Sequence, residues 1–524
     1  MKDTIEDELI GKIKEKGIFS EYLPENFNVK TDGWNIYGAG ASYKDHVEPY
    51  SYYMSRFNKT GDKRMISIPE IGTYVSLVNF LYDNKSTILR TCIERSKEDK
   101  NSFSRFINDN GGIVDVDFTY GDVTSTLILD DGVESNEYEK ERSVYVNNMI
   151  RKIRTTIGAA GILHIDISEF YRNIYTHILG CIKMGIVGLK TAFDQGEDSA
   201  DYKLYSQLDD RVRRLNGART NGLLVGPYIS RILSESILAV VDEELRELGL
   251  TFTRYADDYE IAVYQDDNDT DIIHLVTSVF DKYYLRINTE KTFYEEYPFY
   301  IFSNYEKVIE KIQHNNRIDS PEIVELFNCF FDMEKKGEKG AVRYLLKSYS
   351  NKYVVSNKTL YINYLVNVIC NDEKNMPLAC KILIDEFRCK HVRLDSSIKD
   401  IIYKHLQYNI KNGNNLAVVW LVYLLVNTGY NFDKEFIRCL LKTRNELSII
   451  VLLEEQSWLF DAQLFNECWN QSDSWLMLYQ IALRSEDKRE LYLDKLQINN
   501  NRDFYNRLFK KGFSFYKKTG VYTE

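Results

Sequence analysis

Prolines and closely spaced cysteines are scarce in this sequence. Seven prolines in 524 residues, and no linker rich in glycine and serine, leave no obvious hinge between domains. The eight cysteines include no Cys-x-x-Cys pair, which disfavours a structural zinc site and a disulfide framework. The longest strongly apolar run, Leu416 to Val426, is about half the roughly 20 residues that a membrane span needs. It predicts a buried helix, so we expect no membrane partner.

The start of the sequence lacks the features of a secretory signal. Met1 to Asp7 has no apolar core behind a basic start. We therefore expect a cytoplasmic protein. Disorder of the whole chain is also excluded, because 44% hydrophobic and 28% charged residues are close to globular averages.

An excess of positive charge is lacking as well. The 67 lysines and arginines against 78 aspartates and glutamates give a net charge of −11, which argues against a nucleic-acid binder because phosphates need cations. Residues 141–160, 203–220 and 503–518 are nevertheless each net positive. In the last stretch, phenylalanines and tyrosines alternate with cations, which is typical of surfaces that bind single-stranded nucleic acid. Solvated helix faces are the alternative interpretation.

The chain divides into three regions by pattern. At about 150 residues per domain, its length predicts two to four domains. Residues 1–160 mix short helical and strand-like pieces, and residues 161–310 alternate clear strands with helices, which predicts an α+β or α/β core. Residues 311–524 are almost entirely amphipathic helices. Their succession suggests a HEAT-like solenoid, although no fixed sequence period proves it.

An aspartate ends a strand in the central region. Gly161 to Ile167 is an apolar run that contains Asp166 near its end. Ser168 then has the side chain of a helix cap, and the apolar spacing that follows predicts a helix through Ile178. Asp166 is therefore expected at the rim of a sheet.

A second acidic pair lies between two β-rich runs. Thr251 to Tyr264 predicts a hairpin with Asp257 and Asp258 at its turn. If this hairpin lies beside the first strand, three carboxylates meet and repel one another, and divalent cations are the natural compensation. An Asp-Asp pair alone is also typical of a solvated turn, as at Asp266-Asp267. The flanking residues must therefore decide between a site and a turn.

Those flanking residues resemble the reverse transcriptases. Tyr255-Ala256-Asp257-Asp258 is similar to the third palm motif of that family, and Asp166-Ile167-Ser168-Glu169-Phe170-Tyr171 to its first. Asn221 to Ser230 is similar to the second motif and Leu285 to Thr292 to the fourth. The four motifs follow one another in family order. The resemblance implies a fold of fingers (1–160) and palm (161–310), then an all-α helical-repeat domain (311–524) in place of a conventional thumb.

The resemblance also implies site residues. The catalytic carboxylates would be Asp166, Asp257 and Asp258, which together with Ile167 would hold two Mg²⁺ ions, with Mn²⁺ as an alternative. The residues expected to contact the nucleotide are Phe170, Tyr171, Gly226, Pro227, Lys291, Arg64, Arg151 and Arg154.

Several of these roles have structural alternatives. Tyr171 would lie under the incoming sugar and exclude a 2′ hydroxyl, or it packs in a helix core. Gly226 and Pro227 would let the backbone approach the nucleotide before a helix from Tyr228 to Leu248, or they form an ordinary loop. Lys291 would act near the departing pyrophosphate, or it is a surface lysine.

Within the family, the sequence is most similar to the bacterial abortive-infection group typified by AbiK. The grounds are the first motif continuing to His177, an Ile68-Pro69 dipeptide leading into a helix to Phe80, and the helical C-terminal region. That likeness implies antiphage defence, synthesis of single-stranded DNA from dNTPs without a template, and a homo-oligomer. It also implies a priming tyrosine in the chain itself, for which Tyr37 and then Tyr43 are the candidates.

Two other functions remain open. The first is an RNA-templated reverse transcriptase that uses an associated noncoding RNA, which would make RNA a partner. The second is a catalytically inactive palm with a helical scaffold that binds nucleic acid or protein, since solenoids bind partners along concave surfaces. The presence of all three carboxylates favours an active enzyme.

Overall fold

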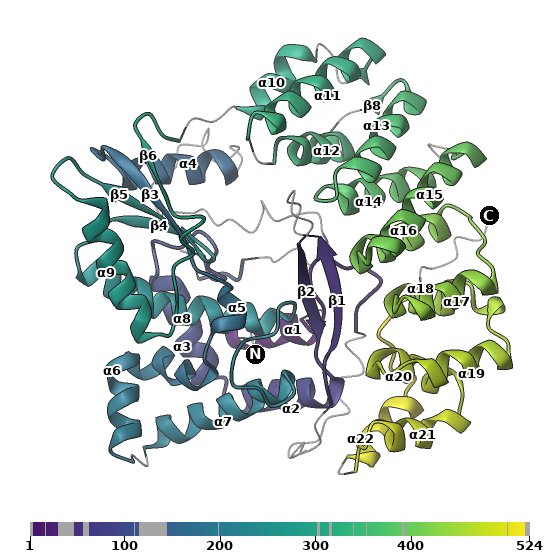
Figure 1. The fold of residues 1–524 in the computed structure, drawn as a ribbon, viewed down its shortest axis with the longest axis horizontal. Helices are drawn as coiled ribbons and strands as arrows, with labels where there is room; N and C mark the ends of the chain where they lie inside the picture. Colours follow the sequence, from purple (N-terminus) through teal and green to yellow (C-terminus); the bar gives the residue numbers. More distant parts are fainter. Residues whose placement is uncertain are drawn as a thin grey trace.

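The computed structural model of the chain is a mixed α+β fold, as expected (Figure 1). It describes residues 4–15, 17–29, 47–55, 62–108, 111–114, 144–196, 199–300, 304–313, 317–338, 340–352, 354–389, 393–499 and 501–518. A four-stranded antiparallel sheet and a separate hairpin lie among many helices. The domain boundaries at residues 160 and 310 stay predictions.

The four-stranded sheet combines segments that are far apart in the sequence. Its strands are β3 (Gly161–Asp166), β4 (Phe252–Tyr255), β5 (Asp258–Val263) and β6 (Phe293–Glu296). They lie in the order β4-β5-β3-β6, and every neighbouring pair is antiparallel. β3 is central, which explains why its run of apolar residues is almost wholly buried.

Helices cover both faces of this sheet. They are α4 (Val144–Thr155), α8 (Tyr228–Glu247) and α9 (Asp269–Lys282). On one face, the Tyr259 ring lies 5.5 Å from that of Phe280 in α9, and the Tyr259 hydroxyl donates to Asp242 of α8 at 2.8 Å. On the other face, Glu260 pairs with Lys152 of α4 at 2.5 Å. Because neighbouring residues of a strand point to opposite faces, β5 contacts helices on both faces of the sheet.

The second β unit is a hairpin near the centre of the molecule (Figure 1). It consists of β1 (Tyr50–Ser55) and β2 (Lys63–Ile68). In the sequence, α1 (Ile5–Glu15) precedes the hairpin, and α2 (Ile71–Asp83) and α3 (Ile88–Glu98) follow it. The Glu70 carboxylate caps α2 by accepting from the Gly72 N–H at 2.8 Å, which agrees with the helix expected after Pro69. The Ser67 N–H donates to the Val225 carbonyl at 2.8 Å. The hairpin is thereby joined to the segment before α8.

The prediction of a single helix from Ser168 to Ile178 is wrong. The chain instead forms a short α5 (Phe170–Asn173), a 3-10 helix (Thr176–Gly180), α6 (Cys181–Asp194) and α7 (Ala200–Leu215). Glu169 precedes α5 with a left-handed φ of 43°, and no side chain caps that helix. The Ile174 carbonyl accepts from the Gly222 N–H at 2.9 Å. Pairing with this distant segment replaces the helical hydrogen bonds that the local pattern predicts.

A helical-repeat array forms the C-terminal region. Its helices are α10 (Tyr305–Ile312), α11 (Ser320–Lys335), α12 (Ala341–Lys352), α13 (Lys358–Asn371), α14 (Met376–Arg388), α15 (Ser396–Asn412), α16 (Asn415–Asn427), α17 (Lys434–Lys442), α18 (Glu446–Glu455), α19 (Ala462–Gln471), α20 (Trp475–Arg484), α21 (Asp487–Lys495) and α22 (Arg502–Lys510). Successive helices pack as pairs, and α12, α14, α16, α18 and α20 also pack on one another in a row. The array runs in an arc from α10, at the top of the view, past the hairpin at α16 and down to α22 (Figure 1).

The most apolar helix of the array is buried, as its sequence predicts. Every residue from Asn415 to Leu425 in α16 is buried. This helix also packs on β1, where its Asn415 side chain accepts from the Tyr53 N–H at 3.0 Å. In the part of the chain that the structure describes, no helix combines the length and apolarity that crossing a membrane requires.

Residues 17–29 link the hairpin to the array. The hydroxyl oxygens of Ser20 and Tyr52 lie 2.5 Å apart. The Trp420 indole of α16 donates to the Tyr22 carbonyl at 2.8 Å. One short segment therefore contacts both units.

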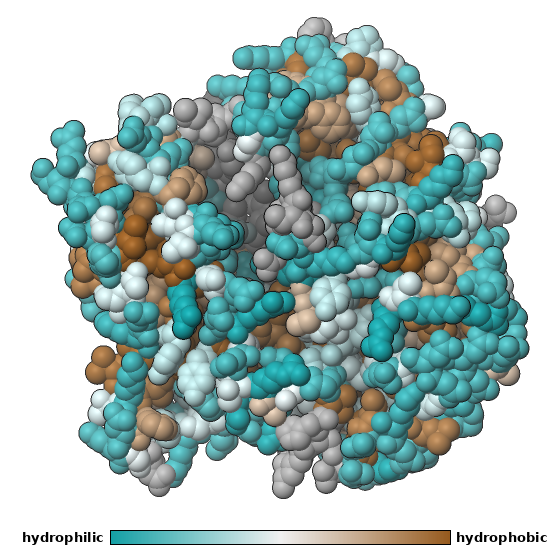
Figure 2. All heavy atoms as spheres, in the orientation of Figure 1, coloured by the Kyte–Doolittle hydropathy of each residue, from teal (hydrophilic) through white to brown (hydrophobic). Residues whose placement is uncertain are grey.

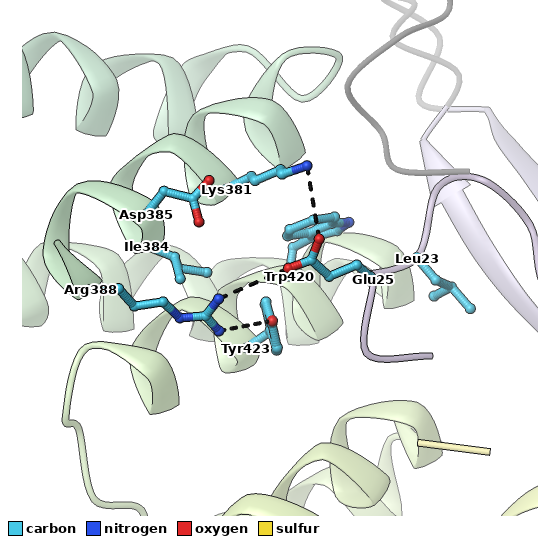
Figure 3. A pocket seen from close by; sticks show the side chains of 8 residues that line it. All are labelled: Leu23, Glu25, Lys381, Ile384, Asp385, Arg388, Trp420 and Tyr423. Carbon is cyan, nitrogen blue, oxygen red and sulfur yellow. Dashed lines mark hydrogen bonds and ion pairs between the residues drawn. The ribbon is translucent and has the colours of Figure 1, made fainter. Parts of the chain in front are cut away.

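Glu25 extends this link over the array (Figure 3). Its carboxylate lies 3.9 Å from Lys381 and 4.0 Å from Arg388, both on α14. Arg388 also donates to the Tyr423 hydroxyl of α16 at 3.3 Å. The cavity between these side chains is about 10 Å³, which is room for about one water molecule. The segment is thus closely packed.

The basic and aromatic stretch 503–518 packs on the same N-terminal segment. Asn26 and Lys517 exchange two hydrogen bonds of 2.7 Å, and Phe27 pairs with Tyr516 as an antiparallel bridge. The aromatic side chains of this stretch are buried, namely Phe504, Tyr505, Phe509, Phe513, Phe515 and Tyr516. The expectation that they stack on single-stranded nucleic acid is therefore wrong. They form a core that joins two distant parts of the chain.

Candidate active site

Three aspartates meet at one end of the β3–β5 ladder. Asp166 and Asp258 are directly opposite each other in the antiparallel register. Ala256 and Asp257 form the turn between β4 and β5, and the Asp257 carbonyl accepts from the Ile167 N–H at 3.1 Å. The hairpin thus lies beside the first strand, which is the condition that brings the carboxylates together.

The pKa values of Asp257 and Asp258 reflect this arrangement. Partial loss of hydration raises the pKa of Asp258 to about 7 although its side chain is exposed, with further contributions from the Asp257 charge and a hydrogen bond with Asp166. Burial also raises the pKa of Asp257, to which the Asp166 charge contributes. The charges of Arg64 and Lys291 oppose the rise at Asp257. The Asp166 charge thus makes Asp257 harder to ionise, and Asp166 and Asp257 together make Asp258 harder to ionise.

Both side-chain oxygens of Asp166 already have partners. Asn288 Nδ2 donates to Oδ1 at 2.9 Å, and Lys291 Nζ donates to Oδ2 at 2.8 Å. The Asn288 N–H also donates to the Asp166 carbonyl at 2.8 Å. Lys291 is 64% exposed although Asp166 is buried. Asn288 was not singled out from the sequence; its position three residues before Lys291 in the fourth motif is the signal that could have indicated it.

The aromatic pair after Asp166 lies partly in the core. Phe170 is buried and its ring lies 5.4 Å from that of Tyr171. The Tyr171 hydroxyl accepts from Ser234 of α8 at 3.4 Å, and burial raises its pKa to about 12. Tyr171 remains partly exposed, so it combines a packing role with a surface that a nucleotide could reach.

Gly226 lies against the hairpin, where the backbone leaves no room for a side chain. Its φ is 135°, and a Cβ atom would lie 2.7 Å from the Ser67 carbonyl oxygen. Pro227 follows as the N-terminal boundary of α8, which runs from Tyr228 as predicted. The close approach therefore joins the start of α8 to β2, the strand that carries Arg64.

Replacing Gly226 with alanine is expected to lower the free energy of unfolding by about 1–3 kcal/mol, because it adds a backbone clash to an unfavourable φ. Thermal unfolding measures this effect. The matched control is Gly249→Ala, since Gly249 has a φ of 82° but no atom lies within 4 Å of the position that the alanine Cβ would take. Equal losses in the two variants would show that the contact with Ser67 contributes nothing.

The expected basic residues are not gathered at one place. Arg64 acts on Asp257, as its effect on that pKa indicates. Arg151 of α4 donates to the Lys100 carbonyl, and its guanidinium lies 5.0 Å from the centre of the Phe103 ring. Arg154 is exposed on the same helix. Arg64 is thus the arginine that the structure links to the carboxylates, and Tyr37 and Tyr43 lie outside the described residues.

A buried arginine behind the turn was missed from the sequence. The Arg254 side chain is 0% exposed and pairs with Asp99 at 2.9 Å, Glu235 at 3.1 Å and Asp242 at 2.7 Å. These carboxylates raise the pKa of Arg254 well above its ordinary value against the opposing effect of burial. Burial raises the pKa of Asp242, and the Asp99 charge adds to it. The network joins α8 and the residues after α3 to β4.

The same network holds the backbone of Ala256. This residue has a left-handed φ of 52°, which is unfavourable for alanine. The Arg254 guanidinium donates to the Ala256 carbonyl at 2.9 Å, and the Ala256 N–H donates to Ser104 Oγ at 2.7 Å. Ser104 in turn donates to Glu235 at 2.8 Å. Both polar groups of the turn residue before Asp257 are therefore fixed by one buried cluster.

The raised pKa of Asp258 predicts a stability that depends on pH. Because the folded protein keeps a proton that the unfolded chain has lost, stability falls as pH rises from about 4 to about 7. Asp258→Asn removes this loss. In EDTA at pH 8, the variant is expected to be more stable than the parent by about 1 kcal/mol, a small value because solvent screens charges on an exposed side chain. At pH 4 this advantage disappears.

Thermal unfolding at both pH values tests this effect. Asp266→Asn, at an exposed aspartate, serves as the control and is expected to change stability equally at both values. An Asp258→Asn variant that gains nothing between pH 4 and pH 8 would contradict the expectation.

The described residues do not contain a ready cation site. Across them, no group of three aspartate, glutamate, histidine or cysteine side chains is placed to hold a metal ion. Asp166, Asp257 and Asp258 supply carboxylate oxygens, the ligands that Mg²⁺ prefers. Lys291 pairs with the carboxylate of Asp166. The side chain of Ile167 is apolar and buried, so only its backbone could contribute.

Comparisons with known proteins add little to this geometry. No protein-family model matches the chain, and no curated protein matches it. Among solved structures, the chain is similar to apo telomerase from Candida Tropicalis, with a TM-score of 0.31 and 11% sequence identity, covering 79% of this chain and 70% of that one. A TM-score this low does not establish a shared fold.

Proposed function

We propose that this chain is a reverse-transcriptase-like DNA polymerase that adds deoxynucleotides by nucleotidyl transfer. The observation that carries the proposal is the meeting of Asp166, Asp257 and Asp258 at the end of two paired strands, where partial desolvation and neighbouring charge raise the pKa of Asp258 to about 7. Carboxylates held together against their repulsion are more typical of functional sites than of structural turns. The four sequence motifs supply the reaction class.

Carboxylate oxygens are the ligand type that Mg²⁺ prefers, and two Mg²⁺ ions, or Mn²⁺ in their place, are the proposed ions, although the three side chains are not gathered around one point in the described residues. Asp166, Asp257, Asp258 and the backbone of Ile167 would hold them. When bound, such ions activate the attacking hydroxyl and stabilise the leaving pyrophosphate. In the transfer itself, the attacking oxygen forms a bond to the α-phosphorus and the bond to pyrophosphate breaks.

Other residues of the chain would position the nucleotide. Arg64 is the best supported of the three candidate arginines for the triphosphate, because its charge already acts on Asp257. Lys291 is exposed beside Asp166. If Asp166 binds a metal ion, the Lys291 ammonium group can leave that carboxylate and turn towards the pyrophosphate. Tyr171 would lie under the sugar, and Gly226 and Pro227 would line the approach, whereas Phe170 is buried behind Tyr171 and is not available for the contact with the nucleotide that its sequence position predicts. Arg151 and Arg154 remain weaker candidates.

The likeness to the abortive-infection group extends this proposal. It supports protein-primed synthesis without a template, a single-stranded DNA product, assembly as a homo-oligomer in the cytoplasm, and a role in antiphage defence. Tyr37 and Tyr43 are the proposed primers. The regular stacking of α12, α14, α16, α18 and α20 supports a HEAT-like array in the position of the thumb.

A labelling experiment tests the proposal. The purified full chain is incubated with Mg²⁺ and each labelled dNTP, without template or primer, and the products are separated on a denaturing gel before and after protease digestion. We expect label that migrates with the protein until protease releases it as DNA. This result would direct the search for the primer to Tyr37 and Tyr43.

Two other outcomes would change the conclusion. Incorporation that requires an added or co-purified RNA, with a product complementary to that RNA, would establish templated reverse transcription. No incorporation with any dNTP, metal ion or RNA would overturn the polymerase proposal and favour a binding scaffold.

A further inference from the structure

A large cavity lies away from the three aspartates, on the side of the molecule formed by α6 and α7. Its volume is about 760 Å³, within the range of about 300–1,000 Å³ that is usual for small-molecule sites. The 3-10 helix at Thr176–Gly180 forms a further wall. α6 bends around the cavity at Gly185, whose φ of 66° and ψ of 167° are not helical.

Aromatic side chains line much of this cavity. They are Tyr175, Phe193, Tyr202, Tyr205 and Tyr284. The rings of Tyr175 and Tyr284 lie 5.3 Å apart at 70°. Phe193 is 70% and Tyr284 54% exposed, and Figure 2 shows hydrophobic residues gathered on the surface over α6. Exposed rings of this kind offer faces on which a flat heterocycle can stack.

A buried carboxylate in the wall has one oxygen without a partner. Asp209 of α7 is 7% exposed, and its Oδ2 lies 2.6 Å from His177 Nδ1 and 3.5 Å from Arg213 Nε. Its Oδ1 is buried and has no hydrogen-bond partner within the described ranges. An unsatisfied buried acceptor costs about 1–3 kcal/mol. Through its Oδ2, the Asp209 carboxylate holds His177 in the cavity wall.

Cations stand beside the aromatic walls. Lys190 is exposed, and its Nζ lies 6.0 Å from the centre of the Tyr284 ring. Arg213 has a side chain that is 28% exposed and lies 3.4 Å from Asp210. Asp194 also lines the cavity and offsets one of these charges. Lys190 and Arg213 are suited to an anionic group attached to a stacked ring.

We propose that this cavity binds a nucleotide. The base stacks among Tyr175, Tyr284 and Phe193, and the phosphate pairs with Lys190. The ligand is either a free nucleotide or one nucleotide of a single strand, since both present the same base and phosphate. This site is separate from Asp166, Asp257 and Asp258, and it requires neither a metal ion nor catalysis.

Equilibrium binding measured in EDTA tests the proposal. The full chain carrying Asp257→Asn is titrated with each of the four deoxynucleoside monophosphates, with the matching nucleosides, and with short single-stranded oligonucleotides. We expect saturable binding of at least one monophosphate or oligonucleotide, and at least tenfold weaker binding of the nucleoside. Tyr284→Asn and Lys190→Ala are each expected to weaken the binding about tenfold. Asparagine suits the left-handed φ of 60° at Tyr284.

Two matched controls separate this site from general attraction. Lys183→Ala removes an exposed lysine of the same helix that does not line the cavity, and Tyr297→Ala removes a tyrosine that is 73% exposed. Neither control is expected to change the affinity. Binding of monophosphates identifies a free nucleotide as the ligand, and binding of oligonucleotides alone identifies a strand.

The proposal is overturned if no nucleotide or oligonucleotide binds, or if the controls weaken binding as much as the cavity variants. Because the assay excludes metal ions and uses a chain that lacks Asp257, its failure is distinct from a failure of the proposed polymerase activity.

Discussion

Replacing Arg254 with methionine is expected to lower the free energy of unfolding by about 3–5 kcal/mol, because breaking a buried ion pair leaves uncompensated charge. Asp99, Glu235 and Asp242 would all lose the guanidinium they share. The loss is expected to be smaller at pH 5 than at pH 8, since carboxyl groups without their cation can take up protons. Chemical denaturation at the two pH values measures both effects.

Arg246→Met is the matched control for that variant. Arg246 also pairs with Asp99, at 3.2 Å, but its side chain is 36% exposed. Exposed pairs contribute about 0–1 kcal/mol, so the control is expected to change stability little. If the two variants lose the same stability, the burial of Arg254 is not what makes it important.

The second large effect is expected at Asp257. Under the proposed function, Asp257→Asn removes one carboxylate from the set that would hold the metal ions, and we expect incorporation of dNTPs to fall by at least about 10³-fold, or about 4 kcal/mol in the barrier. The fold should persist, because asparagine has nearly the same shape. Incorporation assays at equal protein concentration, with circular dichroism as a check on folding, measure the result.

Asp266→Asn is the control, because it alters another Asp-Asp pair of the same region, one that is exposed. It is expected to leave incorporation unchanged. If Asp257→Asn keeps both incorporation and any defence phenotype, the carboxylates are structural and the scaffold hypothesis is the better one.

Local pattern predicted the elements that carry the site. The apolar run ending at Asp166 is a buried strand, and the β-rich runs around Asp257 and Asp258 form a hairpin. Alternation and turn chemistry are properties of neighbouring residues, so one sequence suffices to recognise them. Leu416 to Val426 is a buried helix for the same reason. The site's residues could therefore be nominated before their contacts were known.

Contacts between distant segments could not be predicted in this way. The role of Arg254 depends on Asp99 and Glu235, and nothing in its own neighbourhood distinguishes it from a strand residue that faces solvent. The helix expected after Ser168 ends early because Ile174 pairs with Gly222. Tertiary hydrogen bonds of this kind override local preference.

The stretch 503–518 illustrates a related limit. Alternating cations and aromatics are equally consistent with a nucleic-acid surface and with an amphipathic packing face. The structure buries the rings of Phe509 and Phe515 and leaves Lys517 and Lys518 exposed. A composition that is ambiguous in sequence is thus resolved only by knowing which face has a neighbour.

The pairing of Asn26 with Lys517 has a consequence for synthesis of the chain. These residues are 491 positions apart, so Asn26 and Phe27 emerge from the ribosome long before Tyr516 and Lys517 exist. Until Tyr505 is available to bind Glu70, the hairpin lacks part of its covering surface. Assembly of the whole molecule must therefore be completed after nearly all of it has been translated, and nascent chains stalled before residue 505 should remain open to protease near Phe27, which lacks its partner Tyr516.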